Sequence, residues 1–383
     1  MSDPSVATSF DSSAAKKPSD FPEKDIESVQ SRERLDATAP LATRGRMGRV
    51  QGVQILGTGA FVPDQIVTNE DLAELGCDSD WIIRRTGIQE RRHATPEQAT
   101  SDLCYEAAIR CLENAGATAN DLDLILVATI TPDHFTPSTA CHIQRRLGAV
   151  AAAMDLGAAC AGFMYAMTTA AQFIALGNAK RVLVIGADLM SRLVDPNDKK
   201  TFPLFGDGAG AVLMGPSGDS IGDDSQGPAN QGILSYQLGS EGCGGEMLCI
   251  PAGGTRLPLT EEAKAAGQQY LRMDGRNVFK WAVRVFAESA DDVMRDAGIT
   301  SADLDLVVLH QANQRIIDSA VSDLAVSSDK VFVNLNRYGN TSGASIPLAL
   351  DEAARAGRLR RGDLVLLCGF GSGLAWGTAL IRY

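Results

Sequence analysis

The sequence predicts an α/β protein built from two pseudo-symmetric halves, and three observations carry that prediction. Continuous apolar runs alternate with alanine-rich stretches, which is typical of strands covered on both faces by helices. Residues 114–127 resemble residues 296–309 at a constant shift of 182. The same shift places residues 182–186 on residues 364–368. Two separate segments that agree on one offset indicate a duplicated unit, and chance similarity between generic helix–turn–strand segments is the alternative.

The elements follow from the same patterns in order along the chain. Residues 1–46 are polar and lack apolar periodicity, which predicts a disordered N-terminal tail. The first half occupies residues 47–215, and a polar connection at 216–232 leads to the second half at 233–383. We expect buried strands at residues 122–128, 181–185, 304–309 and 364–367, and helices between them that include residues 161–176 and 346–356.

Composition and charge exclude several classes of function. The net charge of −12 argues against broad binding of nucleic acid or of anionic membranes. No apolar run reaches the roughly 20 residues needed to span a bilayer, and no secretory signal opens the chain. We therefore expect a cytoplasmic protein without membrane insertion. The eight cysteines include no CxxC pair, so we expect reduced thiols and no metal site.

Three polar residues stand where functional groups gather in α/β sheets, beyond the carboxyl ends of strands. Cys160 follows a small-residue turn and opens a helix, Asn340 precedes the comparable helix of the second half, and His310 directly follows a strand. The repeat offset brings Cys160 onto Ser342. We therefore expect the turns of Cys160 and Asn340 to be pseudo-symmetric and to face one shared pocket.

Cys160 has the strongest physical case among the cysteines. A helix N-terminus presents free N–H groups and a partial positive charge, which stabilise a thiolate. We therefore expect the pKa of Cys160 to lie below the ordinary value of about 8.5 for a free thiol, a buried structural thiol being the alternative. His310 is preferred over His134, which also follows a strand, because a polar, turn-like segment continues after His310. A structural histidine is the alternative for both.

A cysteine, a histidine and an asparagine together indicate acyl transfer through a thioester. A thiolate can take an acyl group from one thioester, and the N–H groups of His310 and Asn340 can hold the enolate oxygen of a second one. Because asparagine cannot act as a base, the pair favours stabilising the carbanion left by loss of CO₂. The glycine-rich turn of Gly371, Ser372 and Gly373 can bring backbone N–H groups to an oxyanion, or can be a packing turn.

Five motifs stand in a fixed order, at residues 80–88 (DWIIRRTGI), 158–163 (AACAGF), 205–211 (FGDGAGA), 310–313 (HQAN) and 338–342 (YGNTS). Together they resemble the β-ketoacyl-acyl-carrier-protein synthase III family of the thiolase superfamily, over residues 50–383. The resemblance implies a thiolase-like five-layer αβαβα fold, a homodimer, and no cofactor. It also implies condensation of an acyl-coenzyme A primer with malonyl-acyl carrier protein, which releases CO₂ and coenzyme A and initiates fatty acid synthesis.

The resemblance assigns roles to individual residues. It makes Cys160 the acylated nucleophile, and it makes His310 and Asn340 the pair that supports decarboxylation and condensation. A small basic patch would let this acidic enzyme bind an acidic carrier protein, although a solvated surface charge is the alternative for each cation. The implied coenzyme A contacts are Trp81, Arg85, Thr86 and Lys199, and the implied carrier-protein contacts are Lys280 and Arg315.

The chain departs from the family pattern at several of these places. Lys199 stands where an arginine is common, which keeps the charge but loses the bidentate fork. Ser322 and Asp323 replace basic positions of the docking patch, and Ser372 replaces the middle glycine of the last turn. Thr136 stands where short-chain enzymes often carry a phenylalanine at the wall of the acyl pocket. A smaller residue there predicts that longer primers are accepted, since each buried CH₂ gains about 0.8 kcal/mol.

Three rival functions share the fold or the nucleophile. A thiolase would need a second active-site cysteine and a histidine in place of Asn340, and Cys368 is one residue out of the thiolase spacing to Gly371. A related condensing or acyl-transfer enzyme of secondary metabolism is a closer alternative. A non-catalytic subunit of the same fold is the third, although such subunits usually lose the nucleophile.

Overall fold

The structure is a computed structural model, and it describes residues 45–218 and 231–383. Most of the expected tail, residues 1–44, and most of the polar connection, residues 219–230, lie outside the described residues. Among the described helices, none is both long and apolar enough to cross a membrane.

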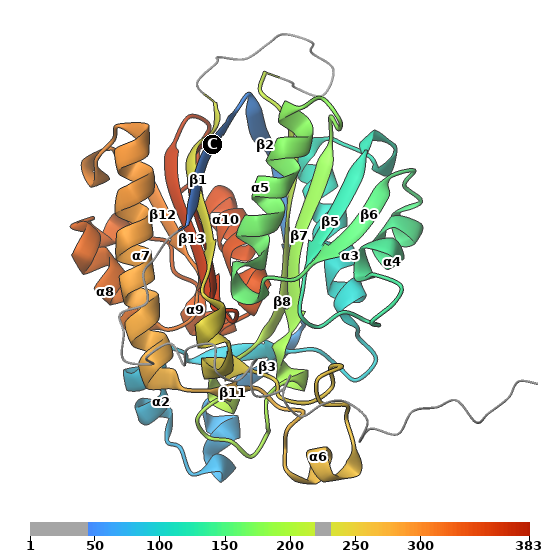
Figure 1. Cartoon of the computed structure of the whole chain (residues 1–383), viewed down its shortest axis with the longest axis vertical. Coiled ribbons are helices and arrows are strands. Elements are labelled where there is room, and N and C mark those ends of the chain that lie inside the picture. Colours follow the sequence, from blue (N-terminus) through green and yellow to red (C-terminus); the bar gives the residue numbers. More distant parts are fainter. Residues whose placement is uncertain (1–44, 219–230) are drawn as a thin grey trace, which may run out of the picture. The chain divides into compact units, whose positions relative to one another are not determined.

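The first half forms a five-stranded mixed sheet (Figure 1). Its two parallel pairs, β5 with β6 and β5 with β7, hold the uniformly apolar strands that the sequence predicts to be buried. Across the sheet the order is β2 (Val53–Phe61), β8 (Asp207–Pro216), β7 (Val182–Leu189), β5 (Leu124–Ala128) and β6 (Ala152–Leu156).

The second half repeats this plan in a second five-stranded sheet. A parallel pair, β12 with β13, again lies beside antiparallel strands. The order is β1 (Arg46–Gln51), β9 (Gly232–Ser240), β14 (Ala375–Arg382), β13 (Leu364–Gly371) and β12 (Leu306–Leu309).

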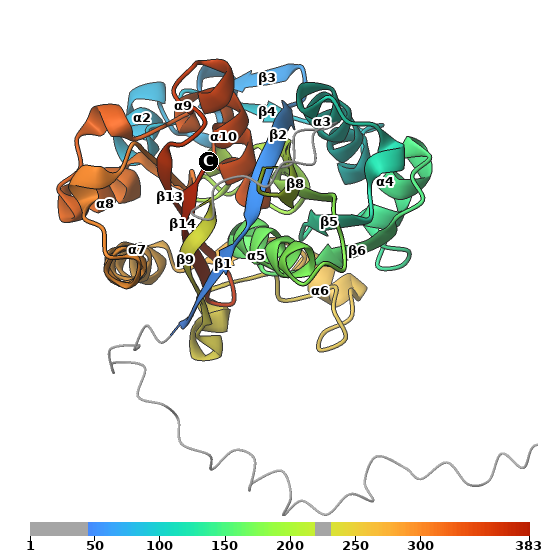
Figure 2. The ribbon, with the colours of Figure 1, turned by 90° about the horizontal axis from the view of Figure 1, so that it is seen from above.

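Helices cover both sheets in five layers, which confirms the predicted αβαβα fold (Figure 2). The central pair packs between the sheets in one apolar cluster and is alanine-rich, which permits close packing on both sides. The central helices are α5 (Gly162–Ala175) and α10 (Ser345–Arg355); the outer ones are α3 (Thr100–Ala115) and α4 (Thr139–Leu147) on the first sheet, and α7 (Gly275–Ala297) and α8 (Gln314–Leu324) on the second.

Shorter elements gather below the sheets in the view of Figure 1. A short helix between two paired strands there carries the DWIIRRTGI motif. These elements are α2 (Ser79–Thr86), β3 (Gln65–Thr68), β4 (Glu90–His93), β10 (Leu248–Cys249), β11 (Arg272–Met273), α6 (Glu261–Ala265) and α9 (Leu335–Tyr338).

The internal repeat is present, but its offset changes by one residue part-way along each half. The Asp123 N–H bonds the Arg181 carbonyl oxygen, and the equivalent Asp305 N–H bonds that of Leu364. Strands β5 and β12 therefore correspond at 182, whereas β7 and β13 correspond at 183, as do α5 and α10. The predicted alignment of residues 182–186 on 364–368 is wrong by one residue, because the second half carries one more residue between β12 and α10. On a strand that shift exchanges the two faces.

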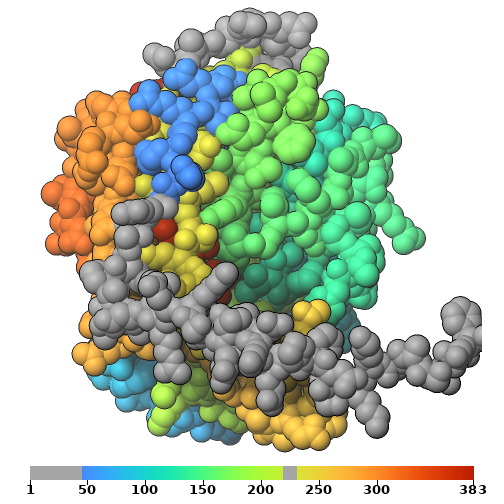
Figure 3. Space-filling view, viewed as in Figure 1, coloured from blue at the N-terminus to red at the C-terminus, as the bar shows by residue number. Residues whose placement is uncertain are grey.

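Strand β1 does not belong to the sheet of the half in which the sequence division places it. It pairs with β9 of the second sheet, and Gly52, at a φ of 76°, turns the chain directly into β2 of the first. The Nε of Arg49 lies 2.9 Å from Asp296 at the end of α7. Figure 3 shows β1 in blue between α5 in green and α7 in orange. The division at residue 47 therefore does not follow the sheets, because β1 buries Val50 in the shared core.

Candidate active site

Cys160 lies in a short 3-10 turn, Ala159–Ala161, that leads from β6 into α5. Its side chain is buried, and the residue is 8% exposed. Strand β13 passes beside this turn at Gly371. A Cβ at Gly371 would lie 3.1 Å from both the nitrogen and the sulfur of Cys160. Because glycine has no side chain, Gly371 leaves both the sulfur and the backbone nitrogen of Cys160 uncovered on this side.

Burial controls the protonation of the Cys160 thiol. It raises the pKa of Cys160 to about 12, and the Ser342 hydroxyl acts in the opposite direction. The expectation of a pKa below 8.5 is therefore wrong for this structure. The helix begins at Gly162, two residues later than Cys160, and loss of hydration outweighs the favourable field at the start of the helix.

Ser342 joins the two halves at this point. Its Oγ lies 3.3 Å from the sulfur of Cys160. The Ser342 backbone N–H donates to Oδ1 of Asn340 at 2.9 Å, and the Asn340 N–H donates to the Leu204 carbonyl oxygen at 2.8 Å. The side-chain oxygen of Asn340 is therefore engaged within the turn, and the NH₂ group of the same amide takes no part in that hydrogen bond. At the offset of 183 Cys160 corresponds to Gly343, so the predicted match of Cys160 with Ser342 is wrong by one residue, although these two side chains are in contact.

His310 directly follows β12, as the sequence predicts. Its backbone N–H donates to the Cys368 carbonyl oxygen at 2.8 Å, and its Nδ1 lies 2.7 Å from Oγ of Ser345. Its ring packs against Phe370 in a T-shaped arrangement, with the ring centroids 5.4 Å apart. Burial lowers the pKa of His310 to about 3, so the imidazole is neutral at pH 7. A neutral imidazole can donate one hydrogen bond and accept another.

The end of β13 brings the three candidate residues together. Phe370 packs on His310, and the next residue, Gly371, contacts Cys160, while Cys160 in turn meets the turn of Asn340. The remaining residues of the glycine-rich turn lie farther out. Ser372 is half-buried and its hydroxyl donates to the Leu248 carbonyl oxygen, and Gly373 is exposed.

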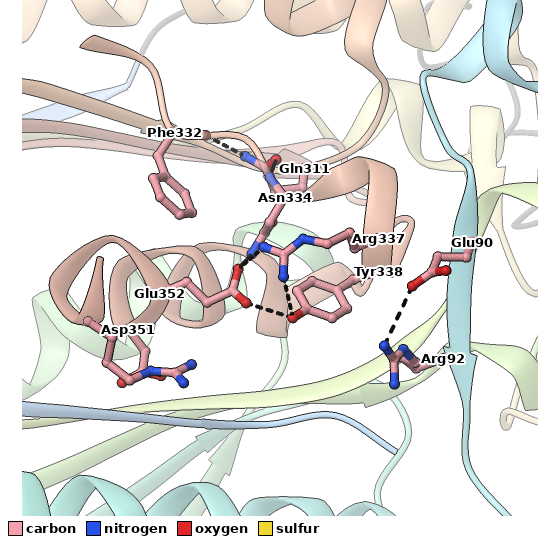
Figure 4. A network of polar contacts seen from close by, with 10 residues as sticks. Glu90, Arg92, Gln311, Phe332, Asn334, Arg337, Tyr338, Asp351 and Glu352 are labelled. Atoms are coloured by element: carbon pink, nitrogen blue, oxygen red, sulfur yellow. Dashed lines mark hydrogen bonds and ion pairs between the residues drawn. The ribbon is translucent and has the colours of Figure 1, made fainter. Parts of the chain in front are cut away.

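A polar network that the sequence did not reveal supports the backbone around His310 and Asn340 (Figure 4). Gln311 accepts a hydrogen bond from the Asn334 N–H at 3.2 Å, and Nδ2 of Asn334 donates to Glu352 at 2.9 Å. Glu352 also accepts from the Tyr338 hydroxyl at 2.6 Å and from Arg337 at 2.8 Å. One carboxylate of α10 therefore ties the segment after His310 to the helix that precedes Asn340.

The predicted coenzyme A residues on α2 lie beside the segment that follows His310. The Arg85 guanidinium lies over the Trp81 ring, 5.4 Å from its centroid, and Nδ2 of Asn313 donates to the Arg85 carbonyl oxygen. Arg85 is exposed and Trp81 half-buried, whereas the buried Thr86 hydroxyl donates to the Ile82 carbonyl oxygen within its own helix. Lys199 is exposed in the loop before β8.

The two predicted carrier-protein contacts lie together on α7 and α8. The Arg315 guanidinium packs over the ring of Phe279, the neighbour of Lys280, at 5.4 Å from the centroid. Both cations are exposed. Arg276 and Arg284 stand four residues on either side of Lys280, on the same face of α7.

Thr136 is exposed in the loop between β5 and α4, next to Phe135, which is 92% exposed. Among the contacts between the described residues, none joins Thr136 to Cys160. The described residues also contain no group of three or more histidine, cysteine, aspartate or glutamate side chains that could hold a metal ion.

Comparison with known proteins places this geometry in a family. Residues 154–242, which include Cys160, match the family described as 3-oxoacyl-[acyl-carrier-protein (ACP)] synthase III. Residues 294–383, which include His310 and Asn340, match its C-terminal part. A beta-ketoacyl-[acyl-carrier-protein] synthase III of Rhodopirellula baltica is 71% identical over 345 residues, covering 88% of this chain and 100% of the relative. The chain belongs to the 3-oxoacyl-[acyl-carrier-protein] synthase III family.

Other synthase III proteins agree with this result. One from Desulfitobacterium hafniense is 48% identical over 333 residues, covering 86% of this chain and 98% of the relative. The crystal structure of the synthase III from Aquifex aeolicus superposes with a TM-score of 0.78 at 42% identity, covering 87% of this chain and all of that one. Membership in the synthase III family confirms that the chain is a condensing acyltransferase of fatty acid synthesis. A priming beta-ketosynthase from the R1128 polyketide biosynthetic pathway also superposes, with a TM-score of 0.78 at 35% identity over 88% of this chain and 98% of that one, so the fold is shared with a condensing enzyme of a specialised pathway.

Proposed function

We propose that this enzyme transfers an acyl primer from coenzyme A to Cys160 and then joins it to the carbanion formed from malonyl-acyl carrier protein. The Cys160 sulfur attacks the thioester carbonyl carbon, the thiol proton passes to the departing sulfur, and coenzyme A leaves as the thiol. Loss of CO₂ from the malonyl group leaves an electron pair that attacks the acyl carbon on Cys160. The bond between the acyl carbon and the Cys160 sulfur breaks, 3-oxoacyl-acyl carrier protein forms, and the released thiolate takes a proton from water. No bound cofactor is needed.

The contact between Cys160 and the turn of Asn340 is the observation that carries this proposal. It supports a site in which one half of the molecule supplies the nucleophile and the other half supplies the hydrogen-bond donors. A neutral imidazole and a carboxamide at His310 and Asn340 can stabilise an enolate oxygen, and neither needs to lose or gain a proton. The burial that lowers the pKa of His310 favours this electrostatic role over proton abstraction.

The repeat itself supports an oxyanion site at the Cys160 turn. At the offset of 183, Cys160 corresponds to Gly343, whose backbone N–H donates to the carboxylate of Asp188 at 3.0 Å. A turn of this shape therefore binds a carboxylate oxygen in the second half. The equivalent position in the first half faces Gly371, which has no side chain, so that a substrate carbonyl oxygen can take the place of the carboxylate.

The exposed cations suggest where each substrate docks. We propose that coenzyme A binds against Trp81 and Arg85 with Lys199 on its phosphates, and that Thr86 acts only by ending the helix that holds them. The stripe of Lys280 and Arg315, extended by the neighbouring cations of α7, suits an acidic carrier protein.

The open edge of the first sheet supports the expected homodimer. Among the strands of the described residues, β6 pairs with β5 alone, and exposed apolar side chains lie on it and just before it, Met154 and the 91% exposed Val150. An unpaired edge with an apolar surface is suited to pairing with a second copy. Phe135 and Thr136 are exposed in the loop before α4, and we propose that a second copy brings Thr136 to the acyl pocket. All eight cysteines are free, which suits the cytosol.

Intact-mass analysis tests the reaction directly. The enzyme is incubated with a panel of acyl-coenzyme A thioesters, then with malonyl-acyl carrier protein, and the mass and position of any adduct are followed. We expect an acyl group on Cys160 that is removed when the second substrate is added. His310→Ala and Asn340→Ala should retain loading while decarboxylation falls, and equal loss of both steps would contradict the roles proposed for them.

The same panel tests the pocket wall. If Thr136 leaves room for longer primers, octanoyl-coenzyme A should load at least as well as acetyl-coenzyme A. A strong preference for the acetyl group would remove the basis for this role of Thr136.

A further inference from the structure

One ring nitrogen of His310 makes a hydrogen bond to a serine side chain that plays no part in the reaction proposed above. Nδ1 lies 2.7 Å from Oγ of Ser345, the first residue of α10. Both residues are only 2% exposed. The backbone N–H of His310 is held by Cys368 and its ring by Phe370. The ring can therefore neither rotate freely nor exchange its Ser345 contact for water.

The protonation of this pair follows from what each atom can donate. A neutral imidazole carries its proton on one nitrogen and a lone pair on the other. Among the hydrogen bonds of the described residues, the Ser345 hydroxyl has one partner, Nδ1 of His310. If Nδ1 carried the proton, it would donate to the serine oxygen, and the buried hydroxyl proton would have no acceptor. If the hydroxyl donates to Nδ1, both groups are satisfied, and the ring proton must reside on Nε2.

We propose that Ser345 is a positioning residue that donates its hydroxyl proton to Nδ1 of His310 and so keeps the imidazole proton on Nε2. This inference rests on the proposed function, in which His310 stabilises an enolate oxygen. An Nε2–H group stabilises such an oxygen, whereas an Nε2 lone pair repels it. No covalent bond to the imidazole forms or breaks. Ser345 acts by selecting the tautomer, and it acts on decarboxylation and condensation, not on the loading of Cys160.

The protein contains only four histidines, which makes the tautomer directly measurable. We would label histidine with ¹⁵N and record the coupling of each ring nitrogen to the ring C–H protons, assigning His310 from the spectrum of His310→Gln. In the wild-type enzyme the proton should be on Nε2. In Ser345→Ala the signal should change to a mixture of the two tautomers. A wild-type proton on Nδ1 would overturn the proposal.

Kinetics provide the second measurement. We expect Ser345→Ala to decarboxylate a malonyl thioester about tenfold more slowly, because one buried hydrogen bond sets the tautomer ratio, while Cys160 loads within about twofold of the wild-type rate. Ser345→Thr keeps the hydroxyl and should recover most of the lost rate. A Ser345→Ala enzyme with the wild-type tautomer and decarboxylation rate would contradict the proposal.

A matched control separates positioning from stability. Ser289 is also fully buried, and its hydroxyl makes a hydrogen bond of the same length, 2.7 Å, to Thr378. Ser289→Ala should lower the melting temperature to a similar extent, with the His310 tautomer and the decarboxylation rate unchanged. If Ser289→Ala altered both in the same way as Ser345→Ala, the role of Ser345 would be structural.

The two hypotheses fail in different ways. If Cys160 took no acyl group and no malonyl thioester lost CO₂, the proposed function would be wrong, and the ¹⁵N measurement would still decide which group donates in the His310–Ser345 pair. If Ser345→Ala did not fold, the wild-type spectrum and the Ser345→Thr rates would decide the same question.

Discussion

The turns of Cys160 and Gly343 are equivalent places in the two halves of the molecule, yet a side chain closes only one of them. The Gly343 N–H donates to the buried carboxylate of Asp188, a residue of β7. The residue of β13 that corresponds to Asp188 is Gly371, and it lies against Cys160. The Asp188 carboxylate therefore fills the space beside the turn of Gly343, whereas no side chain fills the equivalent space beside the turn of Cys160.

The turn of Gly343, closed by Asp188, has a structural role, whereas the turn of Cys160 is open. Asp188 also accepts hydrogen bonds from the Ile130 N–H at 2.8 Å and from the Thr129 hydroxyl at 3.0 Å, so it links β7, the segment after β5 and the second half. Burial raises the pKa of Asp188, and these hydrogen bonds act against that rise. Duplication therefore provides two turns suited to an oxyanion. The chain uses one to hold its halves together and, in the proposed reaction, the other to bind its substrate.

Removing the thiol of Cys160 should have the largest effect, which is the loss of condensation at the open turn. Cys160→Ser keeps the size of the side chain but replaces the nucleophile with a far weaker one, so we expect condensation to fall by at least about 10³-fold. Product formation and intact mass measure this. Cys368→Ala is the control. Cys368 is also buried and forms no disulfide, and its sulfur accepts a hydrogen bond from the Thr378 hydroxyl. An acyl group found on any cysteine other than Cys160 would contradict the assignment.

Removing the carboxylate from the closed turn should cost stability. Asp188→Ala leaves the buried N–H groups of Ile130 and Gly343 without their acceptor, so the free energy of unfolding should fall by about 3 kcal/mol. Denaturant unfolding measures this. Asp188→Asn keeps one carbonyl oxygen and should lose less. A wild-type unfolding curve for Asp188→Ala would show that the closed turn does not hold the halves together.

A side chain at Gly371 should make the open turn resemble the closed one. In Gly371→Ala the new Cβ would lie 2.8 Å from Cβ of Cys160, which is too close, and we expect loading to fall about 100-fold. Gly343→Ala is the pseudo-symmetric control, because the nearest atom to its Cβ, an oxygen of Asp188, is 3.3 Å away. It should load nearly normally and be somewhat less stable. Equal loading by the two variants would mean that the turns do not differ as described.

The last prediction concerns pH, with an effect of about tenfold for each pH unit. Burial raises the pKa of Cys160 and of Cys368 to about 12. Because alkylation requires the thiolate, the rate of iodoacetamide labelling at Cys160 should rise about tenfold per pH unit between pH 7 and 9. Cys368 is 0% exposed and should stay unlabelled in the native protein. A plateau below pH 9 at Cys160 would show that the start of α5 stabilises the thiolate more than burial destabilises it.

Much of the site could be predicted from the sequence because its parts are marked locally. Cys160 stands between small residues at the start of a helical pattern, and His310 follows an apolar run, so each could be found without knowing its partners. Ser345 could not be found in this way. It is an ordinary serine 35 residues from His310, and nothing in the sequence indicates that the two are hydrogen-bonded. Glu352 was missed for the same reason.

By itself the sequence determined the duplicated α/β plan and the residue types at the strand ends, since periodicity and turn composition act over a few residues, whereas the five layers were implied by the family resemblance. Only the tertiary structure decided the register of β13 against the repeat, the closure of one turn by Asp188 and the raised pKa of Cys160. The register of β13 is set by its pairing with β12. The closed turn and the pKa depend on hydrogen bonds and burial between segments more than 150 residues apart, such as Asp188 with Gly343 and Cys160 with Ser342. The packing of the two halves creates those contacts.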